Sequence, residues 1–247
     1  MMKKISLILF VAISFQLFAQ KTVSFKASDG LEVTADLYLT KDDKAPMIIL
    51  FHQAEWSRGE YKEIAPKLNK LGFNCIAVDQ RSGGEVNDIN NETFKRAEAK
   101  GLSTAYVDAM PDMIAAIDYI KNNYKAASKT IIWGSSYSAG LVLKIASERK
   151  DVDGVLAFSP AEYYEKMGKP KDWVTSTIHN INVPTFITSA KMEKKKWWDI
   201  AAKISEDNRA YFLPTKLGKH GSRALWSKYN DSAEYWKAVK EFLALFQ

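Results

Sequence analysis

Three serines follow an apolar, β-branched run in the stretch TIIWGSSYSAG, residues 130–140. The run is typical of a buried strand, and an apolar helical segment begins within a few residues of its end. A turn this tight strains the residue at its centre and pushes that side chain out above the sheet, so the residues two before and two after it must be small. Gly134 and Ser138 meet that requirement around Ser136. Ser136 is therefore a candidate nucleophile, and the following helix directs backbone N–H groups at the place where negative charge would develop.

A serine hydroxyl is a poor nucleophile at neutral pH and needs a base that accepts its proton. The chain has three histidines, His52, His179 and His220. His220 lies in LGKHGSRAL, after the last expected strand and before the terminal helix. The proton acceptor, if it is a histidine, is one of these three.

Strand-like and helix-like patterns alternate along the rest of the chain. Residues 22–40 alternate between polar and apolar around Asp29-Gly30, which indicates an antiparallel hairpin. Continuous apolar runs predict buried strands, and amphipathic segments between them predict helices. The expected strands lie at 46–52, 73–79, 129–134, 152–160, 183–189 and 210–214, and the expected helices at 61–72, 108–122, 138–148, around 198–204 and from 231 onward. We expect Asp231 and Glu234 to form a capping box at the start of the last helix.

This order of elements predicts an α/β fold. We expect a mostly parallel, twisted sheet with an N-terminal antiparallel hairpin and helices on both faces, in a single domain over residues 20–247. Residues 80–103 and 161–180 show no clear periodicity. Both stretches follow strand carboxyl ends, where open α/β sheets bind ligands.

The Gly-x-Ser-x-Ser turn, together with the strand order, resembles the α/β-hydrolase family. Within that family it is similar to the small dienelactone-hydrolase-like and carboxylesterase-like members. The resemblance covers nearly the whole chain after residue 19 and implies the α/β-hydrolase fold without a separate cap domain. Ser138 replaces the second glycine of the family motif. The motif favours Ser136 over Ser135, because Trp133 would occupy a position that must be small, and over Ser138, which lies too far into the helix.

The resemblance also implies a catalytic triad in the chain order serine, acid, histidine. The family places its general base in a His-Gly loop before the terminal helix, which corresponds to His220. Its acid follows the strand expected at 183–189, and Glu193 stands where the family usually has Asp. Glu162, in FSPAEYY after the preceding strand, is the alternative acid, since some members take the acid from that loop.

The segment His52-Gln53-Ala54 corresponds to the His-Gly-x segment of the family. The resemblance implies an oxyanion hole made by the backbone N–H groups of Ala54 and Tyr137. Gln53 replaces the glycine of the family. We expect His52 to brace this loop and not to act as a base.

The remaining motifs suggest no other chemistry. The stretch AVDQRSGGE resembles the family's Asp-x-Arg-Gly-x-Gly loop, and we expect Asp79 and Arg81 to form a structural pair. The three histidines and the single cysteine, Cys75, show no metal-ligand spacing, so we expect no metal. Phosphate-binding and dinucleotide-binding glycine motifs are missing from the sequence, so we expect no cofactor.

Residues 1–19 predict a cleaved signal peptide. Lys3 and Lys4 precede an almost wholly apolar run, and Ala19 is a small residue at the expected cleavage site. A cleaved signal peptide implies that the protein is exported, periplasmic or extracellular. Lipid attachment would need a cysteine at the cleavage site, where none is present, so we expect no stable membrane anchor. The formal net charge of +6 includes both lysines. The lysine cluster at 194–196 is typical of a solvated helix face, so we do not expect nucleic acid as a partner.

The sequence thus predicts a secreted serine hydrolase of carboxylic esters that forms an acyl-enzyme. Its substrate is expected to be a small molecule or an ester on a polymer. Peptide, thioester and lactone bonds suit the same groups. A non-catalytic binding protein on the hydrolase scaffold is the alternative, because the turn, the oxyanion loop and the acid position all depart from the family pattern.

Overall fold

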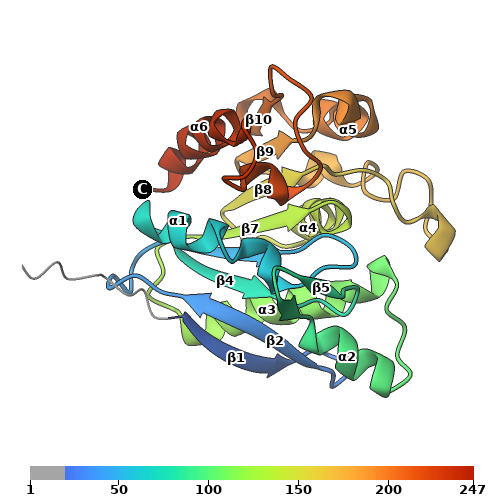
Figure 1. The fold of residues 1–247 in the computed structure, drawn as a ribbon. Coiled ribbons are helices and arrows are strands. Elements are labelled where there is room, and N and C mark those ends of the chain that lie inside the picture. The colour runs from blue at the N-terminus through green and yellow to red at the C-terminus, as the bar shows by residue number, and fades with distance from the viewer. Residues whose placement is uncertain (1–19) are drawn as a thin grey trace, which may run out of the picture.

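One eight-stranded sheet runs through the computed structural model, which describes residues 20–247; the predicted signal peptide, residues 1–19, lies outside them. The strand order is β1-β2-β4-β3-β7-β8-β9-β10, and Figure 1 shows the sheet rising from blue β1 to orange β10. The strands are β1 (Gln20–Lys26), β2 (Glu32–Tyr38), β3 (Met47–Phe51), β4 (Asn74–Val78), β7 (Thr130–Ser135), β8 (Gly154–Phe158), β9 (Thr185–Thr188) and β10 (Arg209–Phe212). β2 pairs antiparallel with β1 and β4, and the other neighbours are parallel. The predicted α/β fold with an N-terminal hairpin is confirmed.

Helices cover both faces of this sheet, as Figure 1 shows. One face carries α3 (Met110–Asn123), α4 (Tyr137–Glu148) and α5 (Lys194–Ala202), and the other carries α1 (Ile64–Lys70) and α6 (Ser232–Leu243). Successive side chains of a strand point to opposite faces. Ile49 and Phe51 of β3 accordingly join the first core, while Ile48 and Leu50 join the second. Burial on both faces explains why the central strands are continuous apolar runs.

The stretch 80–103 contains elements that its periodicity did not predict. They are a small hairpin of β5 (Glu85–Val86) and β6 (Ile89–Asn90), and the helix α2 (Glu92–Ala99). The Asn91 side chain accepts the N–H of Phe94 at 2.8 Å and so caps α2. The other irregular stretch, between β8 and β9, carries only the 3₁₀ turns η3 (Glu165–Met167) and η4 (Ile178–Asn180). Among the helices of residues 20–247, none is both long enough and apolar enough to cross a membrane.

The capping box predicted for the last helix is wrong. Asp231 occupies the N-cap position of α6, but its side chain makes no capping hydrogen bond. Glu234 instead accepts the backbone N–H and the hydroxyl of Thr215, at 2.9 and 2.7 Å. The carboxylate therefore ties the helix to the loop after β10, a contact 19 residues away in the chain.

The predicted pair of Asp79 and Arg81 is also wrong, although both side chains are in ion pairs. Arg81 forms a fork with Asp112 of α3, at 2.6 Å, and also contacts Asp29 at 2.6 Å. Asp79 instead pairs with Arg58 at 2.6 Å. Each of the two side chains thus pairs with an oppositely charged residue from another part of the chain instead of with the other.

The Arg81–Asp112 pair provides a test of the fold. The side chains are 4% and 0% exposed, so Asp112→Ala would leave a buried guanidinium without its fork partner. We expect the free energy of unfolding to fall by about 3–5 kcal/mol in urea denaturation. Asp207→Ala, at an exposed position, serves as the control and should stay within about 0.5 kcal/mol of wild type. If the free energy of unfolding fell no more than in the control, the pair would not stabilise the fold as claimed.

Candidate active site

The turn between β7 and α4 has the backbone strain that its sequence predicts. Ser136 has φ 59° and ψ −119°, a conformation that residues with a side chain rarely adopt. A Cβ at position 134 would overlap the backbone of Ser138, so only glycine fits there. The chain therefore turns from strand to helix at one residue, and that residue is Ser136.

The three serines of the turn have different surroundings. Ser136 is 9% exposed, whereas Ser135 and Ser138 are fully buried. The Ser138 hydroxyl donates to the carbonyl of Phe51 at 2.8 Å and accepts the N–H of Ser135 at 2.8 Å. Ser138 thus fastens the turn to the end of β3, which gives its replacement of glycine a structural reason. Of the three serines, only Ser136 retains solvent-accessible surface.

His220 and Glu193 form a short hydrogen bond. The imidazole Nδ1 lies 2.6 Å from the carboxylate Oε1, and both side chains are partly exposed. Burial works to raise the pKa of Glu193, but the hydrogen bond and charge of His220 and the hydroxyl of Ser159 outweigh it and hold this pKa below its usual value. An ionised carboxylate at Nδ1 orients the ring and leaves Nε2 to exchange a proton.

Ser159 joins this pair and was missed by the sequence analysis. Its backbone is strained, with φ 58°, at the carboxyl end of β8. Its hydroxyl donates to Glu193 Oε2 at 2.8 Å and accepts the N–H of Gly221 at 2.9 Å. It therefore links the acid to the histidine loop. Its place near the carboxyl end of the strand expected at 152–160 was the one available signal.

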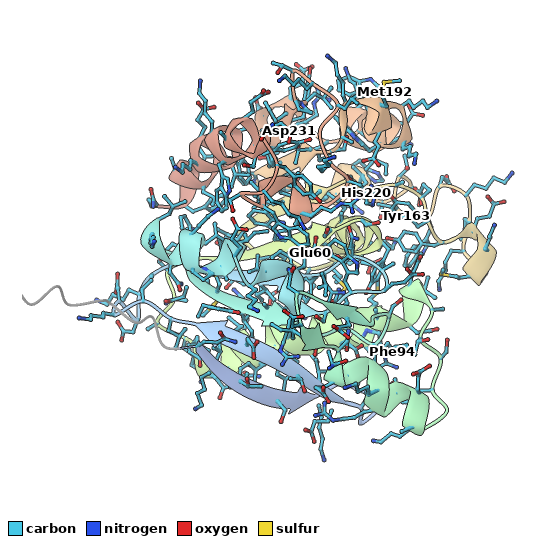
Figure 2. All side chains as sticks on the ribbon, viewed as in Figure 1. Glu60, Phe94, Tyr163, Met192, His220 and Asp231 are labelled. Carbon is cyan, nitrogen blue, oxygen red and sulfur yellow. The ribbon has the colours of Figure 1, made fainter. Side chains whose placement is uncertain are left out.

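The histidine loop packs against the serine turn. The N–H of Ser222 donates to the Ser135 hydroxyl at 2.9 Å, and a Cβ at position 221 would lie 2.6 Å from the same oxygen. The phenol of Tyr163 donates to the Ser159 carbonyl at 2.9 Å. Burial raises the pKa of Tyr163 to about 12, and a hydrogen bond with Ser136 partly offsets this. Figure 2 labels Tyr163 and His220, both beyond the ends of the central strands in this view.

Glu162 has a different environment. Its carboxylate accepts the backbone N–H groups of Val174 and Thr175, at 3.0 and 2.7 Å, and the Thr175 hydroxyl at 2.7 Å. These bonds fasten the irregular segment between β8 and β9. The structure therefore brings Glu193, and not Glu162, to the imidazole of His220.

The loop after β3 is held by side chains. His52 is fully buried; its Nδ1 lies 2.8 Å from the carbonyl of Gln53, and its Nε2 accepts the N–H of Gln80 at 3.1 Å. Burial lowers the pKa of His52 to about 4, so the ring is neutral at physiological pH and braces the loop.

The backbone amides of Tyr137 and Ala54 are free of acceptors in the part of the chain that the structure describes. Tyr137 is the first residue of α4, so its N–H has no partner within the helix. The N–H of Ala54 donates to no acceptor among residues 20–247. These are the two donors that the sequence predicted for the oxyanion hole.

Other kinds of site are not found near these groups. Within residues 20–247, no three His, Cys, Asp or Glu side chains gather as a metal site would require. Surface cavities of about 610, 660 and 430 Å³ lie elsewhere and include none of the site residues predicted above. The predicted site residues thus lie apart from these three cavities.

Comparison with known proteins identifies the family of this chain. The family model described as serine aminopeptidase, S33, matches residues 42–197, which is more than half of the chain. No curated protein sequence matches the chain.

Solved structures share the fold over almost the whole chain. An esterase of Pyrococcus furiosus is 20% identical, with 93% of each chain covered and a TM-score of 0.70. A dienelactone hydrolase of Anabaena variabilis is 15% identical, with 92% of this chain and 98% of that chain covered and a TM-score of 0.69. An acylaminoacyl peptidase of Pyrococcus horikoshii is 14% identical over 94% of this chain and 42% of that chain, with a TM-score of 0.67. The family match and the fold together show that this chain belongs to the serine aminopeptidase S33 family of α/β hydrolases.

Proposed function

We propose that the protein is a serine hydrolase that cleaves carboxylic esters through Ser136, His220 and Glu193. The observation that carries the proposal is the 2.6 Å bond between His220 and Glu193, on loops that pack against the strained turn at Ser136. The hydrogen-bonded pair of His220 and Glu193, together with a serine in this chain order, provides the residue types that nucleophilic catalysis by serine requires.

The proposed reaction has two steps. The Ser136 oxygen attacks the ester carbonyl while His220 accepts the hydroxyl proton, and the N–H groups of Ala54 and Tyr137 hold the oxyanion. Collapse of this intermediate releases the alcohol, which takes the proton from His220, and leaves an acyl group on Ser136. Water, deprotonated by His220, then attacks the acyl carbonyl. Collapse of this second intermediate releases the acid, and the proton on His220 returns to the Ser136 oxygen. Glu193 stabilises the imidazolium in both steps.

A peptidase is the second candidate, because the family model is described as an aminopeptidase. The same groups would cleave an amide by protonating its leaving amine. Comparing p-nitrophenyl esters of increasing chain length with aminoacyl p-nitroanilides separates the two, and the ester reading predicts turnover of the esters alone. Export and a small or polymer-linked substrate stay predictions from the sequence.

Removing the nucleophile tests the proposal. With p-nitrophenyl acetate, Ser136→Ala should lower kcat about 1,000-fold or more, because the acyl-enzyme can no longer form. Ser205→Ala, at an exposed position, is the control and should hydrolyse the ester at the wild-type rate. Equal activity of Ser136→Ala and wild type would contradict the proposal, and inactivity of the folded wild type toward esters and anilides would favour a binding protein.

The two candidate acids predict different variants. Glu193→Gln should lower kcat by about 10³- to 10⁴-fold, because a neutral amide does not stabilise the imidazolium. Glu162→Gln removes an acceptor from Val174 and Thr175, so it should lower the melting temperature while kcat changes little. If the folded Glu162→Gln variant lost kcat while Glu193→Gln kept it, Glu162 and not Glu193 would be the acid.

A further inference from the structure

Glu60 is a buried carboxylate beside the candidate site that the proposed mechanism does not use. It lies in the 3₁₀ turn η1 (Arg58–Tyr61), which follows the loop after β3. Its side chain is fully buried, an environment in which a carboxylate requires hydrogen-bond donors. Figure 2 labels it in the centre of the molecule.

Both oxygens of Glu60 accept hydrogen bonds from the candidate site. Oε2 accepts the backbone N–H of Gln53 at 2.8 Å, one residue before the predicted oxyanion donor Ala54. Oε1 accepts the hydroxyl of Ser135 at 2.7 Å, one residue before the candidate nucleophile. The carboxylate thus connects the oxyanion loop, residues 52–54, with the serine turn, residues 134–138.

Ser135 extends this connection to the histidine loop, residues 220–222. Its oxygen accepts the N–H of Ser222 at 2.9 Å while its proton goes to Glu60. Close packing supports the same arrangement: a Cβ at position 221 would lie 2.7 Å from Gln53 Oε1 and 3.7 Å from Glu60 Oε1. Three loops that are far apart in the sequence therefore meet around one carboxylate.

Burial and the neighbouring donors act in opposite directions on the charge of Glu60. Burial raises the pKa of Glu60 to about 7, while the bonds from Ser135 and Gln53 and the charge of Arg223 act in the opposite direction. Protonation or an amide would convert one acceptor into a donor that faces Ser135 or Gln53. Neither change preserves both hydrogen bonds.

We propose that Glu60 is a positioning residue that sets the oxyanion loop and the histidine loop relative to Ser136, through Gln53 and Ser135. The inference rests on the proposed function, since it assigns Glu60 an effect on the same site. The loop has Gln53 where the family has glycine, and the bond to Glu60 accounts for how this loop is held in place.

Glu60→Gln and Ser135→Ala test this role. We expect Glu60→Gln to lower kcat for p-nitrophenyl acetate by about 10- to 100-fold, with KM changed less than about threefold, because small displacements of catalytic groups slow the chemical step more than binding. Rates are expressed per active site, titrated with a fluorophosphonate, so that loss of folded protein is not counted as loss of rate. Glu98→Gln, an exposed glutamate of α2, is the matched control.

A double-mutant cycle distinguishes positioning from general stability. If Glu60 acts through Ser135, then Ser135→Ala should lower kcat no more than about twofold further in the Glu60→Gln background. Additive losses that follow the melting temperature, or an unchanged kcat per site in Glu60→Gln, would overturn the proposal. If Glu60→Gln does not fold, Ser135→Ala alone breaks the same connection and must lower kcat per site.

Amide hydrogen exchange gives a result that does not depend on turnover. The Gln53 N–H should exchange at least about tenfold faster in Glu60→Leu than in wild type, because leucine removes both carboxylate oxygens and so the acceptor of this N–H. If the wild type proves inactive, the proposed function fails, and this measurement still decides the role of Glu60. An unchanged exchange rate would show that the carboxylate does not hold the loop.

Discussion

The abrupt change from strand to helix at Ser136 is the constraint on which the site depends. With φ at 59°, the backbone of this residue is strained, and the surrounding structure must hold it in this conformation. Gly134 permits the close approach of the chain, and Ser138 fastens the turn to the carbonyl of Phe51 at the end of β3. Together, the strain at Ser136, the glycine at position 134 and the Ser138 hydrogen bond leave one hydroxyl at the carboxyl edge of the sheet. The loops after β3, β8, β9 and β10 converge at the same edge.

The carboxylates near this edge have distinct partners, which gives them distinct roles. Glu193 is partly exposed and bonded to an imidazole, so it stays ionised and can respond to the charge of His220. Glu60 is fully buried and bonded to a hydroxyl and a backbone N–H, so it holds loops. Glu162 binds two consecutive backbone N–H groups and fastens a surface segment. The same side-chain chemistry thus serves charge stabilisation in one place and loop geometry in the others.

The features that could be predicted from the sequence are those that neighbouring residues determine. The small residues around Ser136 indicated the turn, and the apolar runs indicated the central strands, because these features arise from neighbouring residues. The resemblance to a family indicated the order of Ser136, Glu193 and His220 along the chain. Glu60 and Ser159 could not be found in this way, since their partners lie 75 and 62 residues away. The capping box failed for the same reason: a distant contact with Thr215 competes for Glu234.

The central claim is that the hydroxyl of Ser136 is the activated nucleophile of this hydrolase. Treating the protein with a fluorophosphonate and mapping the modified peptide by mass spectrometry tests it most directly, because phosphonylation needs both an activated serine and an oxyanion hole. The account predicts one adduct, located on Ser136, which disappears when the protein is unfolded before treatment. An adduct on Ser135, Ser138 or a residue outside the turn, or no adduct on the folded protein, would contradict it.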